Sequence, residues 1–453
     1  MIFLLAFPFS WYYLLQILHR EVTPHLSDIC RMKHQNTLEY ARQMDAADSL
    51  NTYRKRFHHP TLNGAEARYF CGNSLGLQPK AVRAALHQEL DDWATHAVEG
   101  HFKAKHPWFS YQDMFAEPIA RIVGALPMEV TVMNALTVNL HLMMVSFYRP
   151  QGKRIKIICE AKAFPSDQYA IESQVAFHGL DPKDAIVEVA PRVGEHLIRH
   201  EDIISAIATH GNEVALVLFG GVNYYTGQLF DMNAITEAGH AVGAQVGFDL
   251  AHAVGNVPLH LHDWNVDFAT WCTYKYLNSG PGAVSGIYVH QRHCNNPTLP
   301  RFAGWWGNNP DTRFKMELGF VPAEGARGWQ MSNVPVLSMA AHKAALDVHD
   351  EVGMERLREK SILLTSYLEF LVATTASSDE VEIITPTNPA QRGCQLSLFV
   401  KKNAKQLHAA LLDAGIITDY REPNVIRLAP VPLYNSFEDV WTFADVLKRH
   451  LGA

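Results

Sequence analysis

Short, almost uninterrupted apolar runs constrain this chain more than any other feature of its sequence. Residues 214–220 read VALVLFG, and residues 244–250, 268–274 and 284–290 read AQVGFDL, FATWCTY and VSGIYVH. Strands that are apolar on both faces are typical of a parallel sheet with helices on both sides, because neither face then meets water. A helical pattern over about 232–242 separates the first two runs. The sequence therefore predicts an α/β fold with a mostly parallel sheet.

The alternation of strand and helix begins earlier, from about residue 66. The segments VTVMNA (130–135) and RIKIICE (154–160) each precede a helical run, and AIVEVAP (185–191) has the pattern of a further strand. We expect these segments to join the same sheet, because consecutive βα units form parallel neighbours.

The pattern changes after about residue 335. A long helical stretch (337–374) is followed by short strands near 382–385 and 394–400 and by a closing helix (437–451), which indicates a smaller α+β domain. We therefore predict four parts: an apolar N-terminal extension (1–31), an N-terminal part of the small domain (32–65), a large α/β domain (66–320) and a small C-terminal α+β domain (321–453).

Composition excludes several classes of protein. With 48% hydrophobic residues the 453-residue chain can fill a large core, which excludes bulk disorder. The 39 basic and 46 acidic residues give a net charge of −7, so no basic excess is available to neutralise nucleic-acid phosphates. The six cysteines are scattered and include no CxxC, which favours reduced, buried thiols and a cytoplasmic location.

The N-terminus is the one anomaly in composition. Residues 1–18 read MIFLLAFPFSWYYLLQIL and carry no charge, but they lack the basic start and small-residue cleavage site of a secretory signal. Pro8, Ser10 and Gln16 interrupt what would otherwise approach the ~20 apolar residues of a membrane span. A weak signal anchor and a dispensable extension before Met32 both remain open. We favour the extension and expect no membrane association.

Two charged residues at the ends of apolar strands carry the chemistry. Lys275 in TYKYLNSGPG follows one strand and precedes a Gly/Pro-rich turn, and Asp249 ends another strand, 26 residues earlier. Open α/β sheets bind ligands at the carboxyl ends of their strands. A lysine that forms a Schiff base and a carboxylate that keeps a pyridine nitrogen protonated are what pyridoxal phosphate requires. Either residue alone would be interpreted as a surface or capping charge, but the pair favours this cofactor.

A phosphate site should then lie nearby. Leu136 and Thr137 stand where a strand turns into a helix, so that backbone N–H groups and the threonine hydroxyl can hold a phosphate; a plain N-cap is compatible with this. Phe164 opens the next helix and could stack on a cofactor ring, although a core position is the alternative. Tyr274 and Tyr225 are further hydroxyl donors, unless they bond only to backbone.

The chain resembles the kynureninase family from about residue 33 to its end. The segments that carry the resemblance are YFCGNSLGLQP (69–79), EGHF (99–102), NALT (134–137), FPSD (164–167), NYYTGQ (223–228), VGFDLAHAVGN (246–256), DWNVDFATWCTYKYLNSGPG (263–282), GWWG (304–307), MSNVP (331–335), RGCQLSL (392–398) and IRLAPVPLYNSF (426–437). The run around Lys275 is the most specific of these.

The resemblance implies a fold-type I pyridoxal-phosphate architecture of the class V aminotransferase group, in a homodimer with shared active sites. Lys275 would be the Schiff-base lysine and Asp249 the partner of the pyridine nitrogen, with Tyr225 as our candidate proton donor or relay. The cofactor site would be lined by Leu136, Thr137, Phe164, Pro165, Ser166, Asp167, Gly220, Asp249, His252, Tyr274, Lys275, Trp305 and Asn333. Relatives have serine where this chain has Gly220, so we expect one hydrogen bond to be lost, worth about 1 kcal/mol of cofactor affinity.

The implied reaction is the hydrolytic cleavage of kynurenine or 3-hydroxykynurenine to alanine and anthranilate or 3-hydroxyanthranilate, in tryptophan degradation and NAD biosynthesis. Arg427 matches the arginine that binds the substrate's α-carboxylate, a task that suits its planar fork. The other expected substrate-binding residues are Ser74, His101, Ser332 and Asn333. Because His101 and Asn333 can bond a ring hydroxyl, we predict a preference for 3-hydroxykynurenine.

The sequence supports three other functions and a metal site less well than this one. Gly72–Gly76 reads GNSLG and fits the G-x-S-x-G motif of serine hydrolases, but Leu77, Gln78 and Pro79 follow before any helix begins. A cysteine desulfurase would need an exposed loop cysteine, whereas Cys394 lies in a strand-like segment. A non-catalytic binding protein would not need Lys275, Asp249 and Arg427. A metal site at His260, His262 and Asp263 is disfavoured, because alternating polar residues are commoner on a strand or loop.

Overall fold

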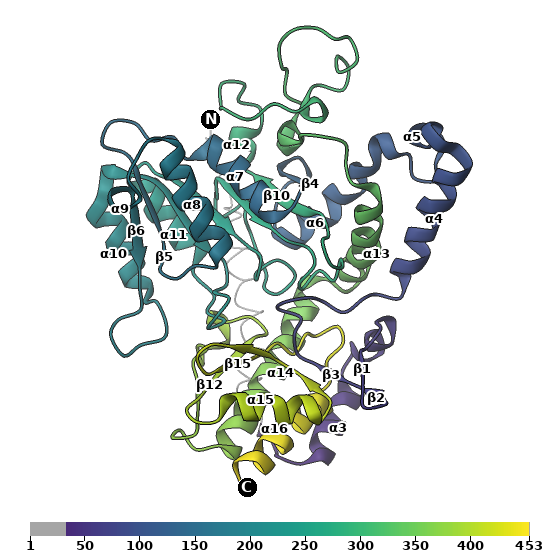
Figure 1. Cartoon of the computed structure of the whole chain (residues 1–453), viewed down its shortest axis with the longest axis vertical. Coiled ribbons are helices and arrows are strands. Elements are labelled where there is room, and N and C mark those ends of the chain that lie inside the picture. Colours follow the sequence, from purple (N-terminus) through teal and green to yellow (C-terminus); the bar gives the residue numbers. More distant parts are fainter. Residues whose placement is uncertain (1–32, 453) are drawn as a thin grey trace, which may run out of the picture.

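A seven-stranded sheet forms the centre of the larger half of the molecule (Figure 1). The computed structural model describes residues 33–452, so the predicted extension and Cys30 lie outside the described residues. The strand order is β4-β10-β9-β8-β7-β5-β6. The bounds are β4 (Val130–Met133), β5 (Lys156–Glu160), β6 (Ile186–Val189), β7 (Val214–Gly220), β8 (Gln245–Asp249), β9 (Phe268–Trp271) and β10 (Ser285–Val289).

The predicted, mostly parallel arrangement is confirmed, with one exception in direction. β10 pairs antiparallel with both β9 and β4, whereas the other pairs are parallel. The connection from β9 to β10 contains no helix and turns the chain back through the Lys275 loop, which suits an antiparallel neighbour. The carboxyl ends of β5, β7, β8 and β9 therefore meet at one edge of the sheet, and β10 begins at that edge.

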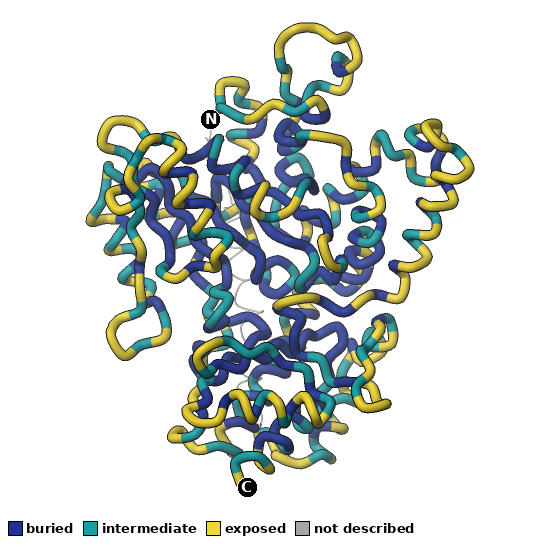
Figure 2. The backbone as a smooth tube through the Cα atoms, in the orientation of Figure 1, coloured by how far each residue is buried: buried dark blue, intermediate teal, exposed yellow. Residues whose placement is uncertain are grey.

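Helices cover both faces of this sheet, and Figure 2 shows its strands as the most deeply buried part. The helices of this half are α4 (Ala81–His96), α5 (Gly100–Lys103), α6 (Ala116–Val123), α7 (Leu136–Phe147), α8 (Pro165–Phe177), α9 (Pro182–Ala185), α10 (His200–His210), α11 (Met232–Ala241), α12 (Gln291–Cys294) and α13 (Val336–Val352). The segment between about residue 81 and β4 is helical, so the strand–helix alternation starts later than the sequence predicts.

A second, four-stranded sheet of order β11-β12-β15-β14 forms the smaller half. Its strands are β11 (Val381–Ile383), β12 (Leu396–Val400), β14 (Asp419–Arg421) and β15 (Val425–Leu428), packed with α14 (Met354–Thr375), α15 (Ala404–Asp413) and α16 (Phe437–Leu451). The predicted stretch over 337–374 is two helices, because Gly353 adopts a φ of 81° between them. Side chains of α13 join the core of the large sheet and those of α14 the core of the small one.

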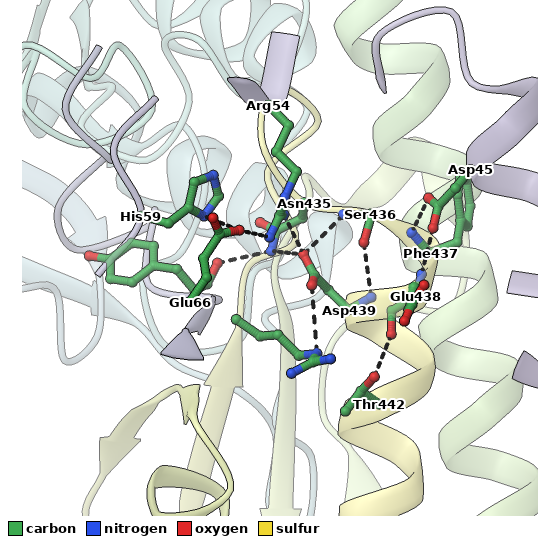
Figure 3. Close-up of polar contacts among 12 residues, drawn as sticks. Asp45, Arg54, His59, Glu66, Asn435, Ser436, Phe437, Glu438, Asp439 and Thr442 are labelled. Carbon is green, nitrogen blue, oxygen red and sulfur yellow. Dashed lines mark hydrogen bonds and ion pairs between the residues drawn. The ribbon is translucent and has the colours of Figure 1, made fainter. Parts of the chain in front are cut away.

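The N-terminal segment joins this smaller half. The helix α3 (Leu38–Ala47) lies beside α16, and Asp45 accepts hydrogen bonds from the backbone N–H groups of Phe437 (2.7 Å) and Glu438 (3.0 Å) (Figure 3). Arg54 then pairs with Asp439 at 2.8 Å and with Glu66 at 2.7 Å. The remaining short strands are β1 (Thr61–Leu62), β2 (Ala65–Glu66), β3 (Arg68–Tyr69) and β13 (Ile416–Ile417), the last two paired in parallel. The exact boundaries of the four predicted parts stay a prediction.

Two simpler expectations concern thiols and membranes. Cys71, Cys159, Cys272, Cys294 and Cys394 are all free and buried, as predicted for these five. Within residues 33–452, every helix is too short or too polar to cross a bilayer.

Candidate functional site

A cavity of about 240 Å³ opens at the carboxyl ends of β5, β7 and β8. It brings together residues from segments that are far apart in the sequence. Ten of its lining residues were predicted from the sequence: Leu136, Thr137, Phe164, Ser166, Asp167, Gly220, Asp249, His252, Tyr274 and Lys275. Eight were not predicted: Ala135, Glu160, Val222, Tyr224, Ala251, Gly282, Ala283 and Ser285.

Lys275 projects into this cavity from the loop that follows β9. Its Nζ lies 2.9 Å from Nε2 of His252 and about equally far, 6.0 and 5.9 Å, from the ring centroids of Phe164 and Tyr274. Burial, followed by the positive charge of Lys275, holds the pKa of His252 well below its usual value. His252 is therefore a neutral imidazole that can accept a hydrogen bond from the lysine.

Two carboxyl groups face one another on the wall of the cavity. Asp249 ends β8, and its Oδ1 accepts from the backbone N–H of Ala251 at 2.8 Å. Its other partner is Asp167, from the first turn of α8. Burial raises the pKa of Asp249, and burial together with the neighbouring charge of Asp249 raises the pKa of Asp167 well above its usual value. The pair can therefore hold one proton between its two carboxyl groups.

Glu160 adds a third carboxyl group that the sequence analysis missed. It ends β5 and is 4% exposed, and its oxygens accept from Asn223 Nδ2 at 2.8 Å and from the backbone N–H of Gly220 at 3.3 Å. Burial raises its pKa to about 7, against the lowering effect of these two bonds. An acid at the end of an apolar strand was the signal that identified Asp249, and the same signal in KIICE identifies Glu160.

The opposite end of the cavity offers hydrogen-bond donors without partners. The helix α7 begins here after Ala135, with no side chain capping its first turn, so the N–H groups of Leu136 and Thr137 have no partner within the helix. The Ser285 hydroxyl is buried and has no hydrogen-bond partner among the described residues. Uncapped N–H groups at a helix start, a threonine hydroxyl and a free serine hydroxyl form a donor set that suits a phosphate group.

The cavity therefore fits pyridoxal phosphate at both ends. Phosphate donors lie at the start of α7, and the carboxyl groups that can hold a pyridine nitrogen proton lie at the end of β8. Lys275 and Phe164 line the same cavity, and Tyr224 packs edge-on against Phe164 with a centroid distance of 5.3 Å.

The GNSLG segment forms a turn that supports the Lys275 loop. The N–H of Gly76 donates to the carbonyl of Tyr274 at 2.8 Å, and a Cβ at Gly76 would lie 2.3 Å from the carbonyl oxygen of Lys275. Glycine is needed here because the two backbones approach so closely. Ser74 is exposed, and the hydrogen bonds found among residues 33–452 include none between its hydroxyl and a histidine. This geometry is that of a packed turn and not of a nucleophile elbow.

A side chain at Gly220 would have to displace the carboxylate of Glu160. A Cβ there would lie 2.7 Å from Oε1 of Glu160, and its N–H donates to that oxygen. The space beside the cavity is thus filled by Glu160.

Several predicted residues do not line the cavity of their own chain. Pro165 is the first residue of α8, between two lining residues. Tyr225 is half-buried and does not line the cavity, whereas its neighbour Tyr224 does. The others are Ser74, His101, Trp305, Ser332 and Asn333; His101 belongs to α5, which lies at the right-hand side of the larger half in Figure 1.

Arg427 lies behind the cavity wall in β15. It is 1% exposed, donates from Nη1 to the carbonyl of Tyr224 at 2.5 Å, and forms an ion pair with Asp419. Its buried position agrees with the apolar neighbours that marked it in the sequence.

Cysteine chemistry is not supported by the described residues. Cys394 lies just before β12 and is 1% exposed, and burial raises its pKa to about 12. Such a thiol stays protonated and out of reach of a substrate. Burial also raises the pKa values of Cys71, Cys159, Cys272 and Cys294.

The edge of the sheet opposite the cavity holds a second polar cluster. Asp267 precedes β9 and accepts bonds from His240 (2.8 Å), His293 (2.7 Å), Arg292 (2.5 Å) and the N–H of Val246 (2.7 Å). Burial alone would raise the pKa of Asp267, but these bonds outweigh it and hold the pKa far below its usual value.

Glu129, beside this cluster, is also saturated with donors. It accepts from the N–H groups of Leu126 (2.9 Å) and Gln291 (2.7 Å) and from His262 (3.0 Å). His290 lies close by, but its Nδ1 accepts from the N–H of Arg292. Asp267 and Glu129 thus each accept bonds that hold strand ends and loops together. Glu129, His262 and His290 lie close to one another, but because these bonds already occupy them we do not assign a metal site here.

Comparisons with known proteins agree with this geometry. Residues 357–447 match the family model "Kynureninase C-terminal domain". A kynureninase of Flavobacterium johnsoniae is 59% identical over 92% of this chain and 99% of that relative, and a kynureninase of the sea anemone Nematostella vectensis is 49% identical over 90% of this chain and 93% of its own.

The solved structures that resemble the chain share its fold at low sequence identity. The cysteine desulfurase CsdA of Escherichia coli has a TM-score of 0.73 at 16% identity, over 89% of this chain and 98% of its own. A cysteine desulfurase of Thermococcus onnurineus has a TM-score of 0.71 at 16% identity, over 85% and 95%. These similarities confirm the predicted α/β architecture of fold-type I, with a large, mostly parallel sheet and a smaller α+β part.

Proposed function

The chain belongs to the kynureninase family, and from this membership and its cavity we propose a role for each residue of the site. The reaction is the hydrolytic cleavage of kynurenine, and the cofactor is pyridoxal phosphate. One observation carries the assignment of roles: Lys275, Asp249 and the uncapped start of α7 line a single cavity. The cofactor, bound there, supplies an electron sink for the bonds at the substrate's Cα and Cβ.

The chain's own residues hold the cofactor and move protons. Lys275 would attach the cofactor, and its free amine would take and return the Cα proton at Nζ. Asp249, paired with Asp167, keeps a proton on the pyridine nitrogen. Phe164 would stack on the cofactor ring, and the start of α7 with Thr137 would hold the phosphate. Remaining cofactor contacts are proposed for Pro165, Ser166, Gly220, His252 and Tyr274.

Tyr225 is proposed as the proton donor or relay for the later steps. Burial raises the pKa of its hydroxyl, so the group stays protonated at neutral pH and is able to donate. Tyr224, which lines the cavity, is a second hydroxyl in the same turn.

We propose a homodimer in which the partner completes each site. Support comes from residues that the family resemblance puts at the site but that lie outside this chain's own cavity: His101, Trp305, Ser332 and Asn333. Trp305 is 47% exposed, with exposed Phe314 near it, and Phe102 next to His101 is 66% exposed. Exposed aromatic side chains of this size are typical of interfaces.

Mixing two inactive variants tests this sharing. Lys275→Ala and Asn333→Ala are expected to be almost inactive alone with 3-hydroxykynurenine, because Asn333 is proposed to contact both the cofactor and the ring hydroxyl. If sites are shared, half of the reassembled dimers are mixed and have one intact site, so activity should return to about a quarter of the unchanged enzyme. An absence of recovery after demonstrated subunit exchange would contradict the shared site.

The proposed preference is for 3-hydroxykynurenine over kynurenine, in a cytoplasmic enzyme with reduced thiols. Arg427 would bind the α-carboxylate, with Ser74 and Ser332 beside the substrate, while His101 and Asn333 would bond the ring hydroxyl. Arg427→Lys should cost ~2 kcal/mol or more in kcat/KM towards both substrates, because a point charge cannot replace the planar fork. His101→Leu should instead penalise only the hydroxylated substrate. Equal losses on both substrates with His101→Leu would refute the proposed contact to the hydroxyl.

A further inference from the structure

Arg427 has a carboxylate partner within its own chain. Asp419 of β14 is the direct cross-strand partner of Arg427 in β15, and its carboxylate accepts from Nη2 of Arg427. Arg421, two residues further along β14, donates from Nη2 to Oδ2 of Asp419 at 3.2 Å and forms an ion pair with the same carboxylate. One carboxylate therefore lies between two guanidinium groups.

The bonds of Arg427 leave one edge of its guanidinium free. Nη1 donates to the carbonyl of Tyr224 and Nη2 to Asp419, so the far end of the fork is fixed at two points. Nε is buried and has no hydrogen-bond partner among the described residues. A carboxylate binds arginine through two parallel N–H bonds, and Nε with the remaining hydrogen of an Nη group presents such an edge.

Arg427 does not itself line the cofactor cavity but packs directly against a residue that does. Tyr224, to which Arg427 donates, lines the cavity, and so does His252. The positive charges of Arg427 and Arg421 also act on His252. Two arginines and one aspartate leave a single positive charge beside the cavity, which matches one carboxylate.

We propose that Asp419 is a positioning residue, which fixes the guanidinium of Arg427 so that its Nε edge faces the α-carboxylate of the substrate. This inference rests on the proposed role of Arg427. It adds that the arginine alone is not sufficient: a cation on a long side chain has many rotamers, and the cross-strand carboxylate selects the one that binds. Asp419 touches neither substrate nor cofactor in this scheme.

The test separates binding of the amino-acid part from binding of the aryl part. Asp419→Asn keeps the shape of the side chain and removes its charge. We expect KM for kynurenine to rise about 10-fold or more while kcat stays within about threefold, because binding of the carboxylate is weakened before the chemical steps. The inhibition constant of L-alanine should rise in parallel. That of 2-aminoacetophenone, an aryl ketone without the α-carboxylate, should not change.

Two further variants keep the test decisive. Asp413→Asn changes an exposed aspartate of α15 and should leave all these constants unchanged. Asp419→Glu retains the charge, so Arg427 stays paired even if Asp419→Asn folds poorly, but the longer side chain displaces the guanidinium and should also raise KM and the L-alanine constant. Thermal unfolding midpoints establish that each variant is folded.

Arg427→Leu distinguishes failure of this inference from failure of the proposed function. If Arg427→Leu raises KM and both Asp419 variants leave it unchanged, the positioning role is wrong and the role of Arg427 stands. If Asp419→Asn lowers KM, Asp419 competes with the substrate, which also overturns the inference. If Arg427→Leu itself leaves KM and the L-alanine constant unchanged, the proposed carboxylate site is wrong and the inference falls with it.

Discussion

Asp249 and Asp267 are buried aspartates at opposite edges of the same sheet, and they differ in how well they are paired. Asp267, 1% exposed, accepts four bonds from two histidines, an arginine and a backbone N–H. Asp249, 6% exposed, has one backbone donor and another carboxyl group as its partners. Burial is nearly equal, but the pKa of Asp267 lies far below its usual value and that of Asp249 above it.

The comparison shows that partners, and not burial, decide the state of a buried acid. At one edge of the sheet the negative charge of Asp267 accepts bonds that hold the strand ends together. The Asp249 edge keeps carboxyl groups short of donors, which leaves them able to bind a group that brings its own proton.

Lys275→Ala should abolish turnover, with a loss of at least ~10⁴-fold, because no other described amine faces the cavity. The fold should persist and pyridoxal phosphate should still bind without covalent attachment. The measurement is turnover of kynurenine together with the visible absorbance of the bound cofactor before and after borohydride treatment. Near-normal turnover would show that Lys275 is not the reactive amine and that the reaction does not take place at this edge of the sheet.

Asp267→Asn should cost about 3–5 kcal/mol of unfolding free energy, because it leaves Arg292 and two histidine donors without a charged acceptor. The kcat of the folded fraction should stay within about threefold of the unchanged enzyme. Chemical unfolding measures the loss, and Asp263→Asn, an exposed aspartate in the same loop, is the matched control.

The Asp267 effect should also depend on pH in a defined direction. Because its folded-state pKa is depressed, its contribution is fully present above the unfolded pKa of about 3.9 and is lost as the pH falls towards the folded value. The difference between Asp267→Asn and the unchanged chain should therefore shrink below about pH 4. A constant difference down to pH 2 would contradict the assigned ionisation.

Asp249→Asn should show the reverse pattern to Asp267→Asn. We expect a loss of about 10²–10³-fold in kcat, because a neutral amide cannot hold the pyridine nitrogen proton. Stability of the cofactor-free chain should be unchanged or slightly higher, since a poorly paired buried acid is removed. Stopped-flow absorbance and unfolding of the same preparation measure the two effects. A loss of unfolding free energy as large as that of Asp267→Asn would contradict the proposed difference between the Asp249 and Asp267 edges of the sheet.

Glu160→Gln should give the smallest effect, visible only as a change with pH. The folded-state pKa of Glu160 is raised to about 7, so its contribution to stability is present below the unfolded pKa of about 4.3 and is lost as the pH rises through 7. Between pH 5 and pH 8 the loss amounts to about 3 kcal/mol in the cofactor-free chain. The glutamine variant should lack this loss when unfolding is compared at pH 5 and pH 8. Parallel curves for the two chains would show that Glu160 is ionised throughout.

Much of the fold could be predicted because its signals are local. β7 occupies residues 214–220, as the apolar run predicts, and α16 occupies 437–451. The same reasoning identified Asp249 and Lys275, since a charged residue at the end of an apolar strand is visible in a short window. The break at Gly353 was missed, because a glycine between two helical patterns does not by itself end a helix.

The features that could not be predicted depend on contacts between residues that are far apart in the sequence. The direction of β10 follows from how the chain returns after the Lys275 loop, which no local pattern records. Tyr224 and Tyr225 are neighbours in one turn, and only the tertiary structure decides which ring lines the cavity. His240 and His293 are 53 residues apart and meet on Asp267, so their pairing cannot be inferred from spacing.

The bonds between α3 and α16 have a consequence for the order in which the chain folds. Asp45 and Arg54 are made early in synthesis, but their partners Phe437, Glu438 and Asp439 are made almost four hundred residues later. The large sheet can form while the chain is still emerging from the ribosome, whereas the N-terminal segment has to wait for the last helix. Contacts of such long sequence separation form late. The docking of α16 therefore completes the folding of the smaller half, and a nascent chain that stops short of residue 437 leaves α3 without its contacts to α16.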